Sequence, residues 1–196
     1  MMEQQIKHFS TDERRKEIAA AATALIVEKG IEALRTREVA ARVGINIATL
    51  HYHVSTKNAL IHLVIDALRD FFAEQYQAHP RDGLSPLQML QLEIQEYKEM
   101  MVSRPDLLQL MDEMFNRGRV DVEVEAKMRE MKIRWNRQFV EILKKGKQEG
   151  QFRENLDPIA GAHMVTGALV AFQYKPKHLF SIFDAVADEI VKSFVK

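Results

Sequence analysis

The chain has 196 residues, of which 46% are apolar and 29% charged, and these proportions are typical of a globular protein and argue against long disordered stretches. Its 28 Lys and Arg residues balance its 28 Asp and Glu residues, so the net charge alone does not indicate nucleic-acid binding. The absence of cysteine excludes disulfides and thiolate metal sites and fits a reducing compartment.

No segment has the pattern of a leader peptide or a membrane span. The N-terminus, MMEQQIKHFSTDERRK, lacks an apolar core. The longest nearly apolar run, residues 159–174, is shorter than the roughly 20 residues that a bilayer span needs. We therefore expect a cytoplasmic protein that has no membrane partner, with residues 159–174 in a buried helix.

The first predicted helix begins at a capping box. Ser10 can accept the N–H of Glu13, whose side chain can reach back to the cap. Apolar residues then recur every three or four positions between Ile18 and Ile26, and Gly30 can supply the left-handed stop. This pattern predicts one amphipathic helix.

Two shorter helices follow. Thr36 is the expected cap of the first, which Gly44 ends, and Asn46 is the expected cap of the second, from Ile47 to His53. Residues 36–54 thus have the spacing of a helix-turn-helix.

Three positions carry that motif. Ala40 lets two helices cross closely, Gly44 can adopt the positive φ of the turn, and Leu50 anchors the second helix on the first. Such spacing also occurs by chance, and the polar and aromatic side chains of the second helix strengthen the assignment.

The rest of the chain reads as further amphipathic helices. Thr56 caps a long one that stops before Pro80, and residues 79–86 form a turn. Five more stripes with a period near 3.6 begin at Leu87, Leu107, Met128, Pro158 and Leu179. The sequence predicts an all-α fold of about nine helices.

The outward face of the helix from Ile47 to His53 carries groups that can bond base edges, cover a thymine methyl or touch phosphate. These groups are Asn46, Ile47, Thr49, Tyr52 and His53, with His51 nearby. A merely solvated helix is the alternative, but it would normally carry Glu, Lys and Gln. A metal site at His51 and His53 is disfavoured because positions i and i+2 lie on different helix faces. We predict no metal and no cofactor.

Residues 20–60, AAATALIVEKGIEALRTREVAARVGINIATLHYHVSTKNAL, resemble the N-terminal signature of the TetR family of bacterial transcriptional regulators. The shared motifs are Glu-Lys-Gly, Thr-x-x-x-Val-Ala, Gly-Ile, Ala-Thr-Leu, His-Val and Ser-Thr-Lys-x-x-Leu. The resemblance covers the headpiece alone, and the remainder agrees in the number and length of its helices. His51 stands where the family usually has tyrosine, and Asn46 where serine is common.

The resemblance implies binding to double-stranded DNA. Thr36 and Arg37 would approach phosphate, and the six groups from Asn46 to His53 would occupy the major groove and its walls. Lys57 has independent support, because a lysine at a helix N-terminus opposes the helix dipole unless an anion binds there.

Arg14, Arg15 and Lys16 crowd the start of the first helix and could also reach the DNA backbone. An ordinary solvated face explains these three residues equally well.

The region after residue 86 contains methionines and aromatic residues suited to an apolar ligand, although a Met-rich core would have the same composition. The resemblance favours a pocket for a small, largely apolar effector. The predicted ligand-binding residues are Tyr97, Met101, Met111, Phe115, Met131, Trp135, His163 and Gly167. For His163, a hydrogen-bonded core histidine is the alternative.

One short recognition helix reads little sequence by itself, so we expect a homodimer on a near-palindromic operator. The last two helices are the candidates for the interface because both are strongly apolar. The predicted interface residues are Val165, Leu169, Phe172, Phe183, Val186 and Ile190.

Three functions compete. The first is a repressor with a helix-turn-helix DNA-binding domain, residues 1–57, and a helical effector-binding and dimerisation domain, residues 58–196. The second is a helix-turn-helix regulator whose C-terminal domain binds a protein. The third, an all-α enzyme, is disfavoured because the sequence has no recognisable carboxylate pair, nucleophile arrangement or phosphate loop.

Overall fold

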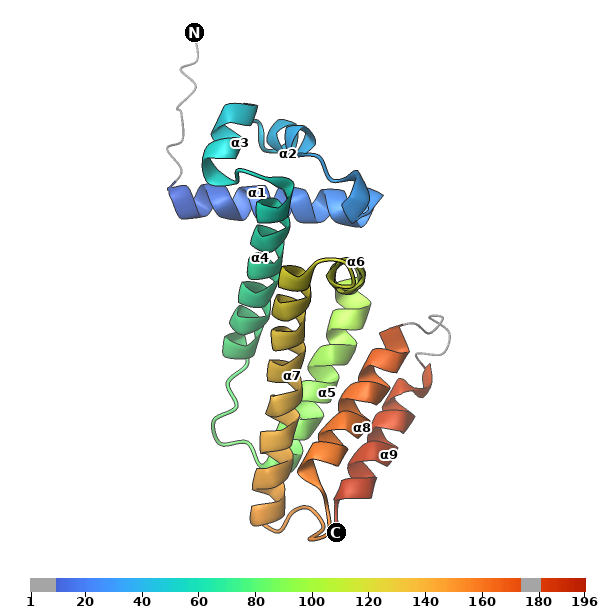
Figure 1. Cartoon of the computed structure of the whole chain (residues 1–196). Helices are drawn as coiled ribbons and strands as arrows, with labels where there is room; N and C mark the ends of the chain where they lie inside the picture. The colour runs from blue at the N-terminus through green and yellow to red at the C-terminus, as the bar shows by residue number, and fades with distance from the viewer. Residues whose placement is uncertain (1–9, 174–180) are drawn as a thin grey trace. The chain divides into compact units, whose positions relative to one another are not determined.

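A computed structural model describes residues 10–173 and 181–196 of the chain (Figure 1). Within these ranges the protein contains nine α-helices, the 3-10 helix η1 and no strand, so the all-α prediction is confirmed. No helix in the described part of the chain combines the length and the apolar character that a membrane crossing requires.

The helices follow the predicted order. Their bounds are α1 Thr11–Lys29, η1 Ile31–Ala33, α2 Thr36–Val43, α3 Ile47–His53, α4 Lys57–Ala78, α5 Pro86–Ser103, α6 Pro105–Gly118, α7 Val122–Gln148, α8 Pro158–Gln173 and α9 Phe183–Phe194. Leu179, where the last apolar stripe was expected to begin, lies outside the described residues.

Most of the predicted helix caps are present. The capping box of Ser10 and Glu13 opens α1, and the hydroxyl of Thr56 accepts the N–H of Ala59 at 3.0 Å in the first turn of α4. The predicted cap of α2 is wrong: Thr36 is the first helical residue, and the cap position belongs to Arg35, which makes no side-chain capping bond.

The described residues divide into two compact units that do not follow chain order. Of the described residues, one unit comprises 10–78 and 109–128, and the other comprises 79–108, 129–173 and 181–196. Helix α4 and residues 109–128 therefore pack with the headpiece, although they come after residue 57. The functional boundary at residue 57 stays a prediction.

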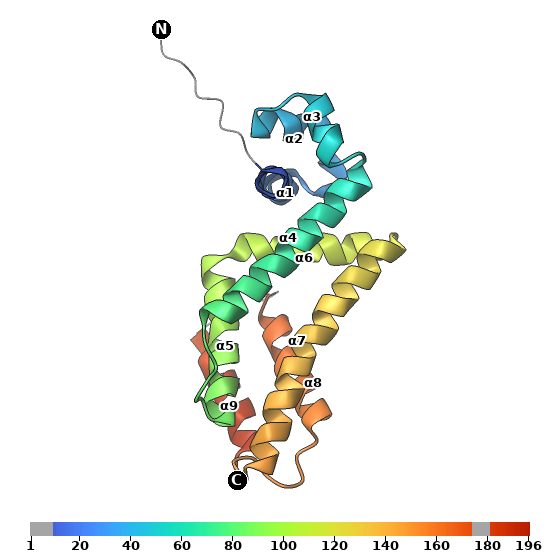
Figure 2. The same ribbon diagram turned by 90° about the vertical axis from the view of Figure 1, so that its left-hand side faces the viewer.

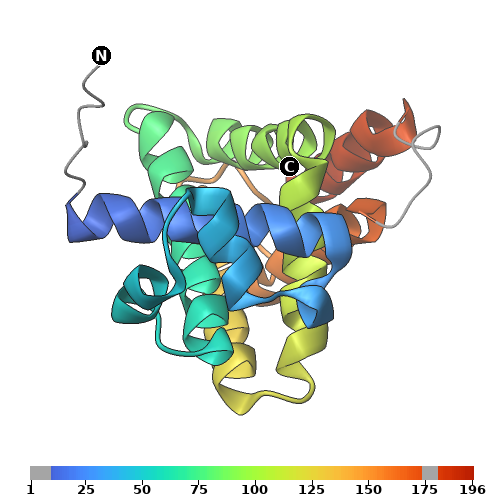
Figure 3. The same ribbon diagram turned by 90° about the horizontal axis from the view of Figure 1, so that it is seen from above.

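In the first unit, α1 packs against α2, α3 and α4, and its apolar stripe forms the centre of the core. Figure 2, which shows α1 end-on, and Figure 3 show α2 and α3 on the same side of α1. Ile18, Ile26, Leu50 and Leu60 have no accessible side-chain surface. This core fixes which face of α3 points outward.

In the second unit, α8 and α9 pack against each other and against α5. Leu90 from α5, Val165 from α8 and Phe194 from α9 are fully buried. Phe152, in the loop before α8, is also fully buried and packs where Gly146 leaves room, because a Cβ at that glycine would lie 2.1 Å from the ring.

Candidate DNA-binding interface and effector region

The turn between α2 and α3 has the geometry that the sequence predicts. Gly44 ends α2 at φ 75° and ψ 31°, a left-handed conformation that residues with a side chain rarely adopt. The N–H of Ile45 bonds the carbonyl of Ala40 at 3.0 Å, which closes the turn. Because a Cβ at Gly44 would meet no atom within 4 Å, the backbone conformation and not crowding requires glycine.

Asn46 caps α3, as predicted. Its Oδ1 accepts the N–H of Thr49 at 2.7 Å. Since that oxygen already has a partner, the side-chain NH₂ is the group of Asn46 with which it could bond DNA. The anchor Leu50 is fully buried on the opposite face of the helix.

The outward face of α3 is aromatic and polar. Tyr52 has 82% of its surface exposed, and His51 and Asn46 are exposed as well. His53 is half-buried, with its ring edge-on to Tyr52 at 5.1 Å between centroids. Ile47 and Thr49, the other two predicted groove residues, are also half-buried. All six predicted groups therefore lie on one short element whose exposed face is free of acidic side chains.

Arg15 has a role that the sequence did not suggest. Its Nη1 donates to the carbonyl of His53 at 2.9 Å and so satisfies the C-terminal end of α3. Arg14 pairs with Glu17 at 2.7 Å, while Lys16 is exposed. The bond from Arg15 joins residues 38 positions apart, which no local pattern reveals.

The predicted phosphate contacts lie at two helix starts. Thr36, half-buried, and Arg37, exposed, are in the first turn of α2, and Lys57 is the first residue of α4. The Nζ of Lys57 donates to the carbonyl of Glu32 at 3.2 Å. The N-termini of α2 and α4 each carry free backbone N–H groups and a basic side chain, Arg37 or Lys57. This combination is suited to binding anions.

The electrostatic surroundings of Lys57 are unfavourable for its charge. Burial lowers its pKa, and the positive charges of Arg35 and Arg117 lower it further, while the Glu32 carboxylate raises it. The attraction of an anion bound at Lys57 would therefore offset both the desolvation and the repulsion.

In the second unit, the predicted effector residues include a packed aromatic cluster. Tyr97 and Trp135 stack with centroids 5.5 Å apart and planes at 20°, and Trp135 meets Phe139 edge-on at 5.6 Å. The hydroxyl of Tyr97 donates to Gln173 Oε1 at 3.5 Å. Met101, which follows Tyr97 by four residues on α5, is buried, and Met131 on α7 is half-buried.

The other predicted effector residues lie elsewhere. Met111 and Phe115 belong to the first unit. His163 and Gly167 are exposed on α8, and a Cβ at Gly167 would meet no atom within 4 Å. The structure therefore does not bring His163 and Gly167 into the interior with Trp135.

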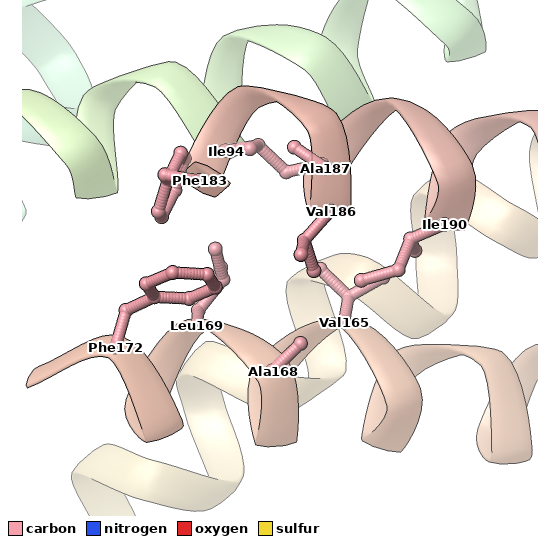
Figure 4. A pocket seen from close by; sticks show the side chains of 9 residues that line it. All are labelled: Ile94, Val165, Ala168, Leu169, Phe172, Phe183, Val186, Ala187 and Ile190. Atoms are coloured by element: carbon pink, nitrogen blue, oxygen red, sulfur yellow. The ribbon is translucent and has the colours of Figure 1, made fainter. Parts of the chain in front are cut away.

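A small apolar cavity lies between α5, α8 and α9 (Figure 4). Nine side chains line it, among them Phe172, Phe183 and Val186, and none of the nine is polar. Its volume is about 10 Å³, which is room for about one water-sized sphere. It cannot hold an effector unless side chains move.

The structure buries several of the predicted interface residues inside the protomer. Val165, Leu169 and Phe172, expected in a dimer interface, are buried within the unit. The exposed apolar residues of α8 are Ile159, 59% exposed, and Met164, 50% exposed. Phe183 on α9 is buried too.

An open, mostly apolar groove of about 370 Å³ runs along α8 and α9 beside Met164. It is lined by Met164, Ala185, Val186, Glu189, Ile190 and Ser193. Of the predicted interface residues, Val186 and Ile190 line this groove and are accessible. Ile159 and Met164 are apolar surface residues that the sequence prediction did not include.

Comparison with known proteins supports the DNA-binding assignment. A model of the family described as bacterial regulatory proteins, tetR family, matches residues 18–64, which span most of α1 through the start of α4. The chain is also similar to the HTH-type transcriptional repressor KstR2 of Mycolicibacterium smegmatis, with 26% identity over 152 residues, 74% of this chain and 70% of the relative.

Two solved structures share the fold. The ketosteroid transcriptional regulator KstR2 of Mycobacterium tuberculosis is similar at a TM-score of 0.65 and 17% identity, over 98% of this chain and 97% of that chain. The transcriptional regulator FadR of Bacillus subtilis, solved with stearoyl-CoA, is similar at a TM-score of 0.72 and 19% identity, over 90% of this chain and 97% of that chain.

Proposed function

Since this chain belongs to the TetR family of DNA-binding transcriptional regulators, we propose that it represses transcription from a near-palindromic operator and releases the operator when a small, largely apolar effector binds. The observation that carries the proposal is the exposed face of α3. Tyr52 and His51 project from a short helix that buried Leu50 holds in a fixed orientation.

In the proposed complex, α3 enters the major groove. Tyr52, His51, His53 and the NH₂ of Asn46 contact base edges, and Ile47 and Thr49 contact methyl groups or the groove wall. Thr36, Arg37 and Lys57 bind phosphates on either side. The contacts to phosphate set the register, and the contacts to bases select the sequence.

We propose a homodimer in which a second copy covers the groove between α8 and α9. Exposed Met164 and Ile159 would otherwise remain in water, and contiguous apolar surface is characteristic of protein interfaces. Val186 and Ile190 extend this surface onto α9. A two-fold dimer presents two copies of α3 to two half-sites.

The proposed effector site is centred on Tyr97, Met101, Met131 and Trp135. The ligand class follows from the chemistry of this cluster, which is aromatic and aliphatic with one phenol hydroxyl. The names of the relatives mention a ketosteroid and a fatty acyl-CoA, both with large apolar parts. A ligand would separate the stacked rings of Tyr97 and Trp135, and this movement would accompany a change in the preferred spacing of the headpieces.

A binding-site selection with randomised duplex DNA tests the proposal. We expect enrichment of a near-palindromic site with half-sites about one helical turn apart. Stearoyl-CoA and a 3-ketosteroid are then added to the complex, while the emission of Trp135, the only tryptophan, is recorded. Enrichment of no site would contradict the DNA-binding assignment. Loss of DNA binding with unchanged emission would place the effector site elsewhere, and a complex that neither probe releases would favour a protein partner.

A further inference from the structure

At the corner between α1 and η1, two backbone groups find no hydrogen-bond partner within their own helices. Gly30 joins the two helices at φ 81°, and its N–H bonds the carbonyl of Ile26 at 2.8 Å. The next carbonyl, that of Val27, belongs to the last turn of α1, and the N–H of Ile31 belongs to the first residue of η1, so each needs a partner outside its own helix. Glycine at the cap position has no side chain with which to bind that N–H.

Helix α6 supplies both missing partners. The Nε2 of Gln109 donates to the carbonyl of Val27 at 2.8 Å, and the N–H of Ile31 donates to Oε2 of Glu113 at 3.0 Å. Gln109 and Glu113 are four residues apart, so they share one face of α6. Each bond joins groups 82 positions apart in sequence, both within the first unit. We call this pair of contacts the clasp.

The same corner positions a predicted DNA contact. Glu32, the residue after Ile31, accepts a bond from Lys57 Nζ through its carbonyl at 3.2 Å. Its carboxylate lies 3.7 Å from Nη1 of Arg117, which is also on α6. The clasp and Arg117 therefore hold η1, and the Glu32 carbonyl of η1 binds the ammonium group of Lys57.

We propose that Gln109 and Glu113 are positioning residues for DNA binding. The clasp holds the α1–η1 corner, and through Glu32 it holds Lys57, in the arrangement that binds the operator. Neither clasp residue touches DNA. Both clasp residues lie on α6, so a shift of this helix along its axis displaces them together.

Amide exchange and DNA affinity of the full chain test the clasp. In Glu113→Ala the Ile31 amide loses its acceptor, so its exchange in the free protein should accelerate several-fold, and affinity for the selected duplex should fall about three- to tenfold. The dependence of affinity on salt should not change, because no phosphate contact is lost. Glu113→Gln keeps an acceptor oxygen and should restore both quantities to within about twofold of wild type.

Two further variants make the result decisive. Asn116→Ala, exposed on the same helix, is the matched control and should behave as wild type. Gln109→Ala changes an exposed side chain, so it tests the second clasp contact without threatening the fold, and it should lower affinity with an unchanged salt dependence.

The proposal fails if Ile31 exchange is the same in Glu113→Ala and wild type. It also fails if Glu113→Ala and Glu113→Gln raise DNA affinity equally, because the carboxylate would then act only by repelling DNA. The exchange experiment needs no DNA, so it can fail or succeed independently of the proposed operator binding.

Discussion

Helices α3 and α8 dispose their apolar side chains in opposite ways. α3 buries a single anchor, Leu50, and turns aromatic and polar groups to the outside. α8 buries Val165 and Leu169 and still leaves Met164 half exposed on its other side. The exposed face of α3 suits a hydrated, charged partner, whereas the exposed face of α8 suits an apolar one.

The contrast also separates mutations that impair folding from mutations that impair binding. A change on the buried side of either helix should act through folding, and a change on its exposed side should act through binding. Three of the predictions below each test one side of α3 or α8, and the last tests Lys57 at the start of α4.

The largest effect is expected on the buried side of α8. Leu169→Glu puts a carboxylate at a residue that is only 3% exposed, beside a cavity lined by apolar side chains alone. We expect the free energy of unfolding to fall by about 3–5 kcal/mol, which is enough to unfold many domains. Chemical denaturation followed by circular dichroism measures this. A folded monomer of wild-type stability would instead mean that Leu169 lies in the dimer interface.

The next largest effect is expected on the exposed side of α8. Met164→Glu should leave the protomer folded but weaken dimerisation by roughly 2 kcal/mol or more, because a charge would enter the apolar centre of the proposed interface. Sedimentation at micromolar concentration measures the shift toward monomer. Val122→Glu, at a residue of the first unit that is 81% exposed, is the matched control and should sediment as wild type. Equal dimerisation of both variants would contradict the proposed interface.

The orientation of α3 could be predicted from the sequence, but the orientation of α8 could not. The facing of α3 follows from Ala40, Gly44 and Leu50, because a glycine-closed turn and one apolar anchor leave a single possible orientation. The facing of α8 could not be predicted in this way. Its residues are apolar nearly all round, so no continuous polar face marks which side meets solvent, and the packing of α5 and α9 decides.

Contacts between residues far apart in the sequence also could not be predicted from sequence patterns. The number of helices and most of their caps depend on residues three or four positions apart, and such patterns are visible in the chain. The bonds from Arg15 to His53 and from Glu113 to Ile31 join distant segments. Arginine and glutamate occur throughout the sequence, and nothing local distinguishes Arg15 and Glu113 from the others.

A smaller effect is expected on the exposed side of α3. Tyr52→Ala should weaken binding to the selected duplex by roughly 1–3 kcal/mol and relax the preference at the bases it contacts. Protein stability should be nearly unchanged, since 82% of the tyrosine surface is already in solvent. Titration of labelled duplexes that vary at each position measures both effects. Tyr76→Ala, an exposed tyrosine on α4, is the control, and equal binding by the two variants would remove Tyr52 from the recognition surface.

The smallest effect is expected at Lys57, and its signature is the salt dependence of binding. Lys57→Gln removes the charge but keeps a side-chain N–H donor, one atom nearer the backbone, that can bond the carbonyl of Glu32 after a small shift. Loss of one phosphate contact per protomer should reduce the slope of log affinity against log salt by about 0.9 for each protomer, similarly for specific and non-specific DNA. Lys132→Ala, exposed on α7 in the second unit, should leave the slope unchanged. If Lys57→Gln keeps the wild-type slope while Lys57→Ala loses specific affinity, the ammonium acts only by bonding Glu32 and does not contact phosphate.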